Sequence, residues 1–190
     1  MSDTNTSSDI QIRQLPLTWM RKMLTILLTF DKDKDGVMGY EDHMQVVDKF
    51  VREANLTGKA RDGIYQTFQD YCTSGESQGI PNSPSVAQQL LTVWIQKDNP
   101  ETVEKWYKIQ TENAQLLSLD VPGFMTFDNY MVYWNGLGLD KRFARMQFDY
   151  MDTNNDGLIS HEEFANGYLE YMCNTDQNNL NRYFGPLMRY

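Results

Sequence analysis

A stretch of twelve residues, 152–163, puts oxygen-bearing side chains at its first, third, fifth, ninth and twelfth positions and a glycine at its sixth. The residues that supply these side chains are Asp152, Asn154, Asp156, Ser160 and Glu163. Apolar residues recur at helical spacing before and after the stretch, so it joins two amphipathic helices. Oxygens from so short a loop converge only where the chain turns sharply, which Gly157 permits. The stretch predicts a helix–loop–helix unit that wraps a hard cation.

Calcium is the cation that this pattern favours, because it takes six to eight oxygen ligands at flexible geometry. We expect Leu158 to contribute its backbone carbonyl, Ser160 to act through a water and Glu163 to bind with both carboxylate oxygens. Ser160 and Glu163 also fit a capping box for the following helix. A polar surface turn is the alternative. The full pattern should arise by chance only about once in a few thousand sequences, which favours the metal site.

A second stretch, residues 31–42, repeats this spacing with Gly36 at its sixth position. Its expected ligands are Asp31, Asp33, Asp35, the carbonyl of Val37, and Asp42. Three aspartates within five residues repel one another unless a cation lies between them, although a solvated acidic turn is an alternative. Asp42 is one methylene shorter than the usual closing glutamate, so coordination should fall toward the six ligands that magnesium requires. The sequence thus predicts two Ca²⁺ sites, with Mg²⁺ best tolerated at the first.

Two further loops can be aligned with these two but lack ligands. Residues 73–83, aligned with Ile80 at the eighth position, offer no carboxylate at the ligand positions, and residues 118–129 have Ser118, Pro122 and Asn129 there. We expect neither loop to bind calcium, and we interpret Asp120 as a turn residue rather than a weak ligand.

The four loops predict an all-α fold of four helix–loop–helix units, of the EF-hand type, in two packed pairs. Short two-stranded β bridges should join paired loops at their eighth positions, which are Met38, Ile80, Met125 and Ile159. Asn99 as a helix cap and Pro100 in the first turn mark the boundary, giving halves at 1–98 and 99–190.

Several local features complete the expected fold. Ser83 and Pro84 should begin a helix, and Met146 should face inward from the helix before residue 152. The apolar tail, with Leu180, Tyr183 and Phe184, should cover apolar surface that would be unfavourable to leave in water.

Charge and composition exclude other classes of protein. The net charge of −9, without a basic run, argues against nucleic-acid binding. Residues 1–9 lack a secretory signal and no stretch is long enough to span a bilayer, so we expect a cytoplasmic monomer that binds no membrane. No nucleophile, base and orienting group are recognisable, so we expect no enzyme activity. Cys72 and Cys173 are expected to be free thiols.

Four segments carry a family resemblance: 30–36, 136–141, 152–158 and 184–187. Together with the leader into Trp19 they resemble invertebrate sarcoplasmic calcium-binding proteins. The resemblance covers nearly the whole chain. It implies four EF-hands in two tightly packed halves that buffer calcium and magnesium in the cytosol, in muscle the sarcoplasm.

Three functions compete: a calcium buffer, a sensor that opens an apolar groove to a target, and a coelenterazine-type protein that binds an apolar small ligand. The short break at residues 98–100 and the apolar tail favour the buffer. His43 and His161 lie beside or within the two binding loops, so we expect neither to polarise a buried chromophore.

Overall fold

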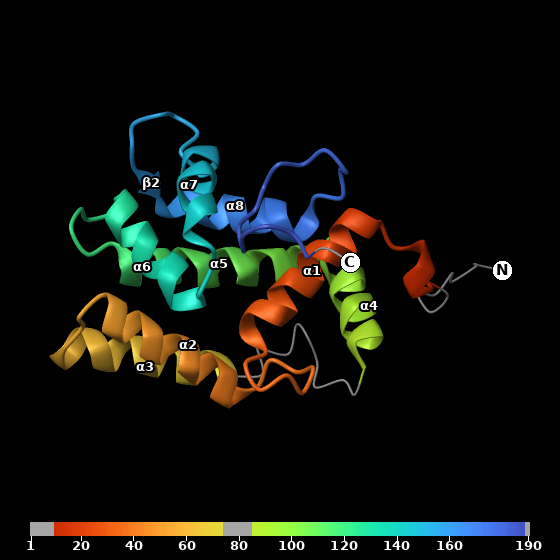
Figure 1. The fold of residues 1–190 in the computed structure, drawn as a ribbon, viewed down its shortest axis with the longest axis horizontal. Helices are drawn as coiled ribbons and strands as arrows, with labels where there is room; N and C mark the ends of the chain where they lie inside the picture. Colours follow the sequence, from red (N-terminus) through yellow and green to blue (C-terminus); the bar gives the residue numbers. More distant parts are fainter. Residues whose placement is uncertain (1–9, 74–84, 189–190) are drawn as a thin grey trace.

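The computed structural model describes residues 10–73 and 85–188 (Figure 1). The α-helices of these residues are α1 (Leu17–Phe30), α2 (Tyr40–Glu53), α3 (Gly58–Thr73), α4 (Val86–Gln96), α5 (Pro100–Leu117), α6 (Phe127–Leu137), α7 (Ala144–Met151) and α8 (His161–Cys173). Short 3-10 turns, η2 (Ile12–Gln14) and η4 (Lys141–Phe143), precede α1 and α7. The all-α prediction is confirmed. No helix in the described part has the length and apolar character to span a bilayer.

Helix boundaries follow capping chemistry. Asn99 Oδ1 accepts a hydrogen bond from the amide of Glu101 at 2.9 Å, with Pro100 in the first turn of α5, as predicted. Helix α4 begins at Val86 with Ser85 as its cap, and the Ser85 hydroxyl oxygen accepts a hydrogen bond from the amide of Gln88 at 3.3 Å. The predicted helix start at Ser83 and Pro84 lies outside the described residues.

One of the two predicted β bridges falls within the described residues. Strands β1 (Phe124–Met125) and β2 (Ile159–Ser160) pair antiparallel, and Met125 lies opposite Ile159. These are the eighth positions of the third and fourth loops, so this bridge is confirmed. The other would join Met38 to Ile80, and Ile80 lies outside the described residues.

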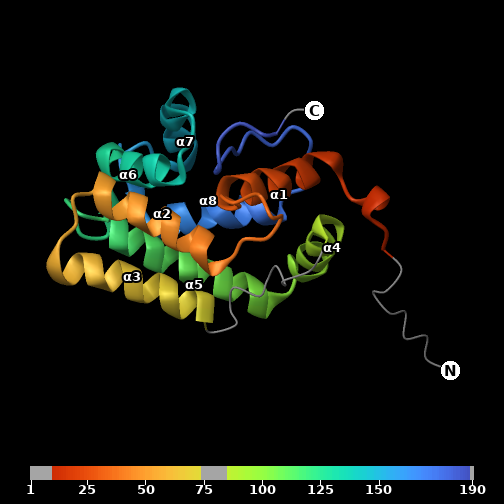
Figure 2. The ribbon, with the colours of Figure 1, turned by 60° about the horizontal axis from the view of Figure 1, so that its bottom comes forward.

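Helices from the two ends of the chain pack against each other. Helix α5 packs along α8, α1 also contacts α8, and α2 lies between α3 and α6 (Figures 1 and 2). The α2–α6 contact is close at Gly136, where an added Cβ would lie 1.9 Å from the Phe50 ring. The core is strongly aromatic, and its fully buried rings are those of Trp19, Trp134, Tyr130, Tyr171, Tyr183, Phe148 and Phe164.

The segment after α8 returns across α8 and α1. Tyr183 is fully buried and Phe184 nearly so, as predicted, but Leu180 is 69% exposed, so it does not cover apolar surface. The tail is held there by polar anchors rather than by Leu180: Asn181 Nδ2 donates to the carbonyl of Gly167 at 2.7 Å. Met146 is likewise exposed, because Gln147 takes the inward position on α7 and accepts a hydrogen bond from the amide of Arg182.

Lys22 on α1 is a fully buried cation beside this returning segment. Its Nζ donates to the Asn174 carbonyl at 3.1 Å and to Asn179 Oδ1 at 2.7 Å. Burial lowers the pKa of Lys22 to about 8, and the nearby charge of Glu170 opposes this only in part. The ammonium therefore joins the first helix to the end of the chain.

Candidate metal centre

The fourth loop, residues 152–163, is ordered by hydrogen bonds from backbone amides to carboxylates. Asp152 Oδ2 accepts from the Gly157 amide at 2.9 Å. Glu163 accepts from the Thr153 amide at 3.0 Å through Oε1 and from the Ser160 amide at 2.9 Å through Oε2. The first and last carboxylates of the loop thereby fix its path.

The first loop, residues 31–42, repeats these bonds position by position. Asp31 Oδ2 accepts from the Gly36 amide at 3.0 Å. Asp42 accepts from the Lys32 amide through Oδ1 and from the Gly39 amide through Oδ2, both at 2.8 Å. A shorter closing side chain therefore makes the same two bonds as Glu163.

The backbone conformations of the two loops also agree. Lys34 and Asn155, both at position four, have φ of 64° and 58°, and the glycines at position six have φ of 86° and 82°. Positive φ is uncommon for residues other than glycine. Both loops therefore turn in the left-handed region at the same two positions.

The first loop provides a test of whether a cation fits. Asp31, Asp33 and Asp35 each offer a carboxylate oxygen, and these three oxygens lie within 4.8 Å of one another. Asp31 Oδ1 is buried, and within the described residues no hydrogen-bond donor reaches it. A buried carboxylate oxygen without a donor is unfavourable unless another positive group satisfies it. The donor set fits a hard cation, which would bind at these three carboxylates.

The expected ligands of the fourth loop hold one another through more side-chain bonds. Asn154 Nδ2 donates to Asp156 Oδ2 at 3.0 Å, and the Leu158 amide donates to Asp156 Oδ1 at 2.9 Å. Ser160 and Glu163 form the predicted capping box. Burial raises the pKa of Glu163, but donors on Ser160 and Thr153 outweigh it and leave the pKa lowered. The closing carboxylate is thus kept in its charged form.

The third loop closes by a different bond. Gly123 keeps the positive φ of position six, at 86°. Asn129, at position twelve, donates from Nδ2 to Asp120 Oδ2 at 2.8 Å, and Thr126 caps the following helix. Position twelve of this loop is therefore an amide bonded to the side chain at position three, whereas position twelve of the other two loops is a carboxylate, Asp42 or Glu163. The second loop, predicted to lack ligands, has residues 74–84 outside the described part of the chain.

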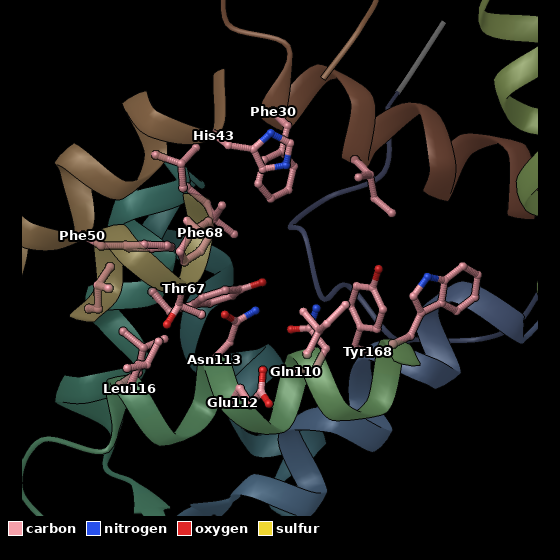
Figure 3. Close-up of a pocket in the computed structure, with 18 of the residues that line it drawn as sticks. Phe30, His43, Phe50, Thr67, Phe68, Gln110, Glu112, Asn113, Leu116 and Tyr168 are labelled. Carbon is pink, nitrogen blue, oxygen red and sulfur yellow. The ribbon is translucent and has the colours of Figure 1, made fainter. Parts of the chain in front are cut away.

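A cavity of about 440 Å³ lies beside the first loop and is lined by residues of α1, α2, α3, α5, α6 and α8 (Figure 3). Its lining includes Phe30, His43, Phe50, Phe68, Gln110 and Tyr168. We expected neither histidine to polarise a buried chromophore, which stays a prediction, but His43 does line this cavity.

The sequence carried a signal for this cavity. His43, Val46 and Phe50 fall on one face of α2 at helical spacing, and Gln110 falls within the apolar face of α5. The polar side chains of His43 and Gln110, at positions of otherwise apolar helix faces, were the indication of a cavity in the sequence. The burial of His43 lowers its pKa, although the Gly39 carbonyl and Asp42 oppose this.

Comparison with known proteins agrees with this fold. Residues 145–167 match the family described as EF hand. No curated protein matches the chain. Among solved structures, the calcium-loaded apo form of the coelenterazine-binding protein from Renilla muelleri is 19% identical, with a TM-score of 0.69 over 89% of this chain and 96% of that chain.

Two further structures are similar. A calcium-binding protein of Streptomyces coelicolor is 17% identical, with a TM-score of 0.66 over 82% of this chain and 98% of that one. Okadaic acid binding protein 2.1 is 18% identical, with a TM-score of 0.64 over 93% and 99% of the two chains. The chain therefore has the fold of EF-hand proteins, and its α7–α8 unit carries the EF hand sequence pattern.

Proposed function

We propose that the protein binds two calcium ions, one in loop 31–42 and one in loop 152–163, and acts as a calcium buffer in the cytoplasm. The observation that carries the proposal is the identical hydrogen-bond framework of the two loops. The buried oxygen of Asp31 supports it, because a cation would supply the partner that this atom lacks among the described residues.

The position of the tail favours a buffer over a sensor. A sensor must expose an apolar groove when calcium binds. Here Tyr183 and Phe184 are buried against α8, and the Trp19 indole donates to the Met172 carbonyl at 2.7 Å. Opening α8 away from α1 would break this bond and expose both rings, which is unfavourable in water.

Magnesium should compete mainly at the first loop. Asp42 is only 3% exposed, and both of its oxygens are held by amides in the same loop. A short, fixed carboxylate favours a coordination number near six, which magnesium requires and calcium only tolerates.

Calorimetric titration with calcium tests the proposal. The wild-type protein should bind two ions, and Asp31→Asn and Glu163→Gln should each reduce the number to one. Asp120→Asn, in the third loop, is the matched control and should leave two. A count other than two in the wild type, or two ions in both loop variants, contradicts the assignment.

Small-molecule binding is a second candidate function. The cavity of about 440 Å³ is the observation that favours it, because its size and mainly apolar lining are typical of ligand sites. Two proteins that share this fold are named for binding coelenterazine and okadaic acid.

A further inference from the structure

Two acidic side chains belong to the lining of the cavity. Most of the lining is buried or half-buried, but Asp70 on α3 and Glu112 on α5 are exposed. The whole chain also has a net charge of −9. Both features disfavour entry of an anion.

Aromatic rings form much of the walls. Phe30 and His43 stack with centroids 5.5 Å apart, and Phe50 and Tyr133 stack at 6.1 Å with an interplanar angle of 18°. Trp106 and Tyr168, which also line the cavity, meet edge to face. Rings of this kind contact another flat ring favourably, by stacking or edge to face. The volume of about 440 Å³ falls in the range of about 300–1,000 Å³ that is typical of small-molecule sites, so a molecule of several fused or linked rings fits.

Polar groups lie at two opposite sides of this space. His43 lies near the first loop, with Nδ1 2.8 Å from the Gly39 carbonyl, so in the tautomer that donates this bond Nε2 is an acceptor. Gln110 and Asn113 lie one turn apart on α5, on the side facing His43 (Figure 3). Gln110 Oε1 accepts a hydrogen bond from the Tyr183 hydroxyl at 3.3 Å. The group that Gln110 can offer to a ligand is therefore its side-chain nitrogen, which is a donor. Asn113 has no side-chain hydrogen bond within the described residues.

The cavity adjoins the first metal loop. Phe30 precedes Asp31 and His43 follows Asp42, and both line the cavity together with Met38 of the loop itself. No residue from 152–163, all of which are described, lines it. A molecule in the cavity would therefore contact both ends of the first loop and neither end of the fourth.

We propose that the cavity binds one planar aromatic molecule that has no negative charge and carries polar atoms at both ends, and that its binding is coupled to calcium at the first loop but not at the fourth. The coupling rests on the proposed calcium binding at loop 31–42. Because coupling is reciprocal, the ligand must change calcium affinity at that loop by the same factor by which calcium changes ligand affinity.

Dye fluorescence tests the site itself. Nile red, which is neutral and planar, should bind with a stoichiometry of one, and the sulfonated dye anilinonaphthalene sulfonate should bind about tenfold more weakly. Leu116→Trp, which fills the cavity from α5, should weaken Nile red binding about tenfold. Gln115→Trp, at the exposed neighbouring position, is the matched control and should change it less than about twofold. Thr67→Phe fills the cavity from α3 and serves if circular dichroism shows that Leu116→Trp does not fold.

The same dye tests the coupling. Calcium should change Nile red affinity about fivefold or more in the wild type and in Glu163→Gln, but not in Asp31→Asn. Equal binding of both dyes, dye binding unaffected by either filling substitution, or a calcium effect lost with Glu163→Gln overturns the inference. A calcium count below two, with dye binding still blocked by Leu116→Trp, contradicts the proposed metal site while supporting the cavity.

Discussion

Replacing the buried Lys22 by methionine tests how α1 is joined to the end of the chain. Methionine keeps an unbranched apolar stem of similar length, so packing changes little. It removes the ammonium, and with it the donors to the Asn174 carbonyl and Asn179 Oδ1. The substitution therefore isolates the electrostatic part of the contact.

The pH dependence of this contribution follows from the pKa of Lys22. Burial lowers that pKa from 10.5 to about 8 in the folded protein. Between these values the unfolded chain binds more protons than the folded one, so the free energy of unfolding rises with pH. Each pKa unit corresponds to about 1.4 kcal/mol, which gives a rise of about 2 kcal/mol from pH 7.5 to 9.5. Lys22→Met should lack this rise.

Urea denaturation at pH 7.5 and 9.5 in saturating calcium measures the effect. The stability difference between the wild type and Lys22→Met should become about 2 kcal/mol more favourable to the wild type at the higher pH. The buried tyrosines, whose pKa values burial raises, affect both proteins equally and cancel in the difference. Lys105→Met, at an exposed position of α5, is the control and should show no such change. A difference for Lys22→Met that stays constant with pH would refute the reasoning.

Two further substitutions test other parts of the structure. Asp42→Glu should raise the ratio of calcium to magnesium affinity at the first loop, because a longer carboxylate can bind with both oxygens; competition calorimetry measures this ratio, and an unchanged value contradicts the argument. Gly136→Ala should lower the free energy of unfolding by about 1–3 kcal/mol, because the added Cβ would overlap the Phe50 ring; denaturation at constant calcium measures it, and a loss below about 0.5 kcal/mol would show that α2 and α6 separate easily.

Features set by residues close in the sequence were predictable. The two loops, the caps at Asn99 and Ser160 and the Met125–Ile159 bridge all follow from spacing within a few residues or from the repeat itself. Ser118, Pro122 and Asn129 were enough to predict that the third loop lacks ligands. The bond between Asn129 and Asp120 that closes this loop could be found only from the structure.

Features set by distant contacts were not predictable in the same way. Periodicity shows that a side chain lies on an apolar face, but not whether that face meets another helix or a cavity. The sequence placed His43 beside a metal loop. Its place in the cavity wall could not be predicted, because α3 and α5 form other parts of that wall. Leu180 and Met146 were expected inside because they are apolar, whereas the polar residues Asn181 and Gln147 occupy the interior beside them.

The bond between Asn129 and Asp120 also bears on the time course of a calcium signal. In a pair of loops that both bind ions, the first ion organises the second loop, and the response to concentration becomes steep. Here the partner loop is closed by an internal bond, and its strand β1 is paired with β2. The proposed fourth site should then fill gradually, with a Hill coefficient of about one, so that its occupancy rises over a wide range of calcium concentration. Such a site smooths a calcium pulse and does not convert it into an all-or-none event.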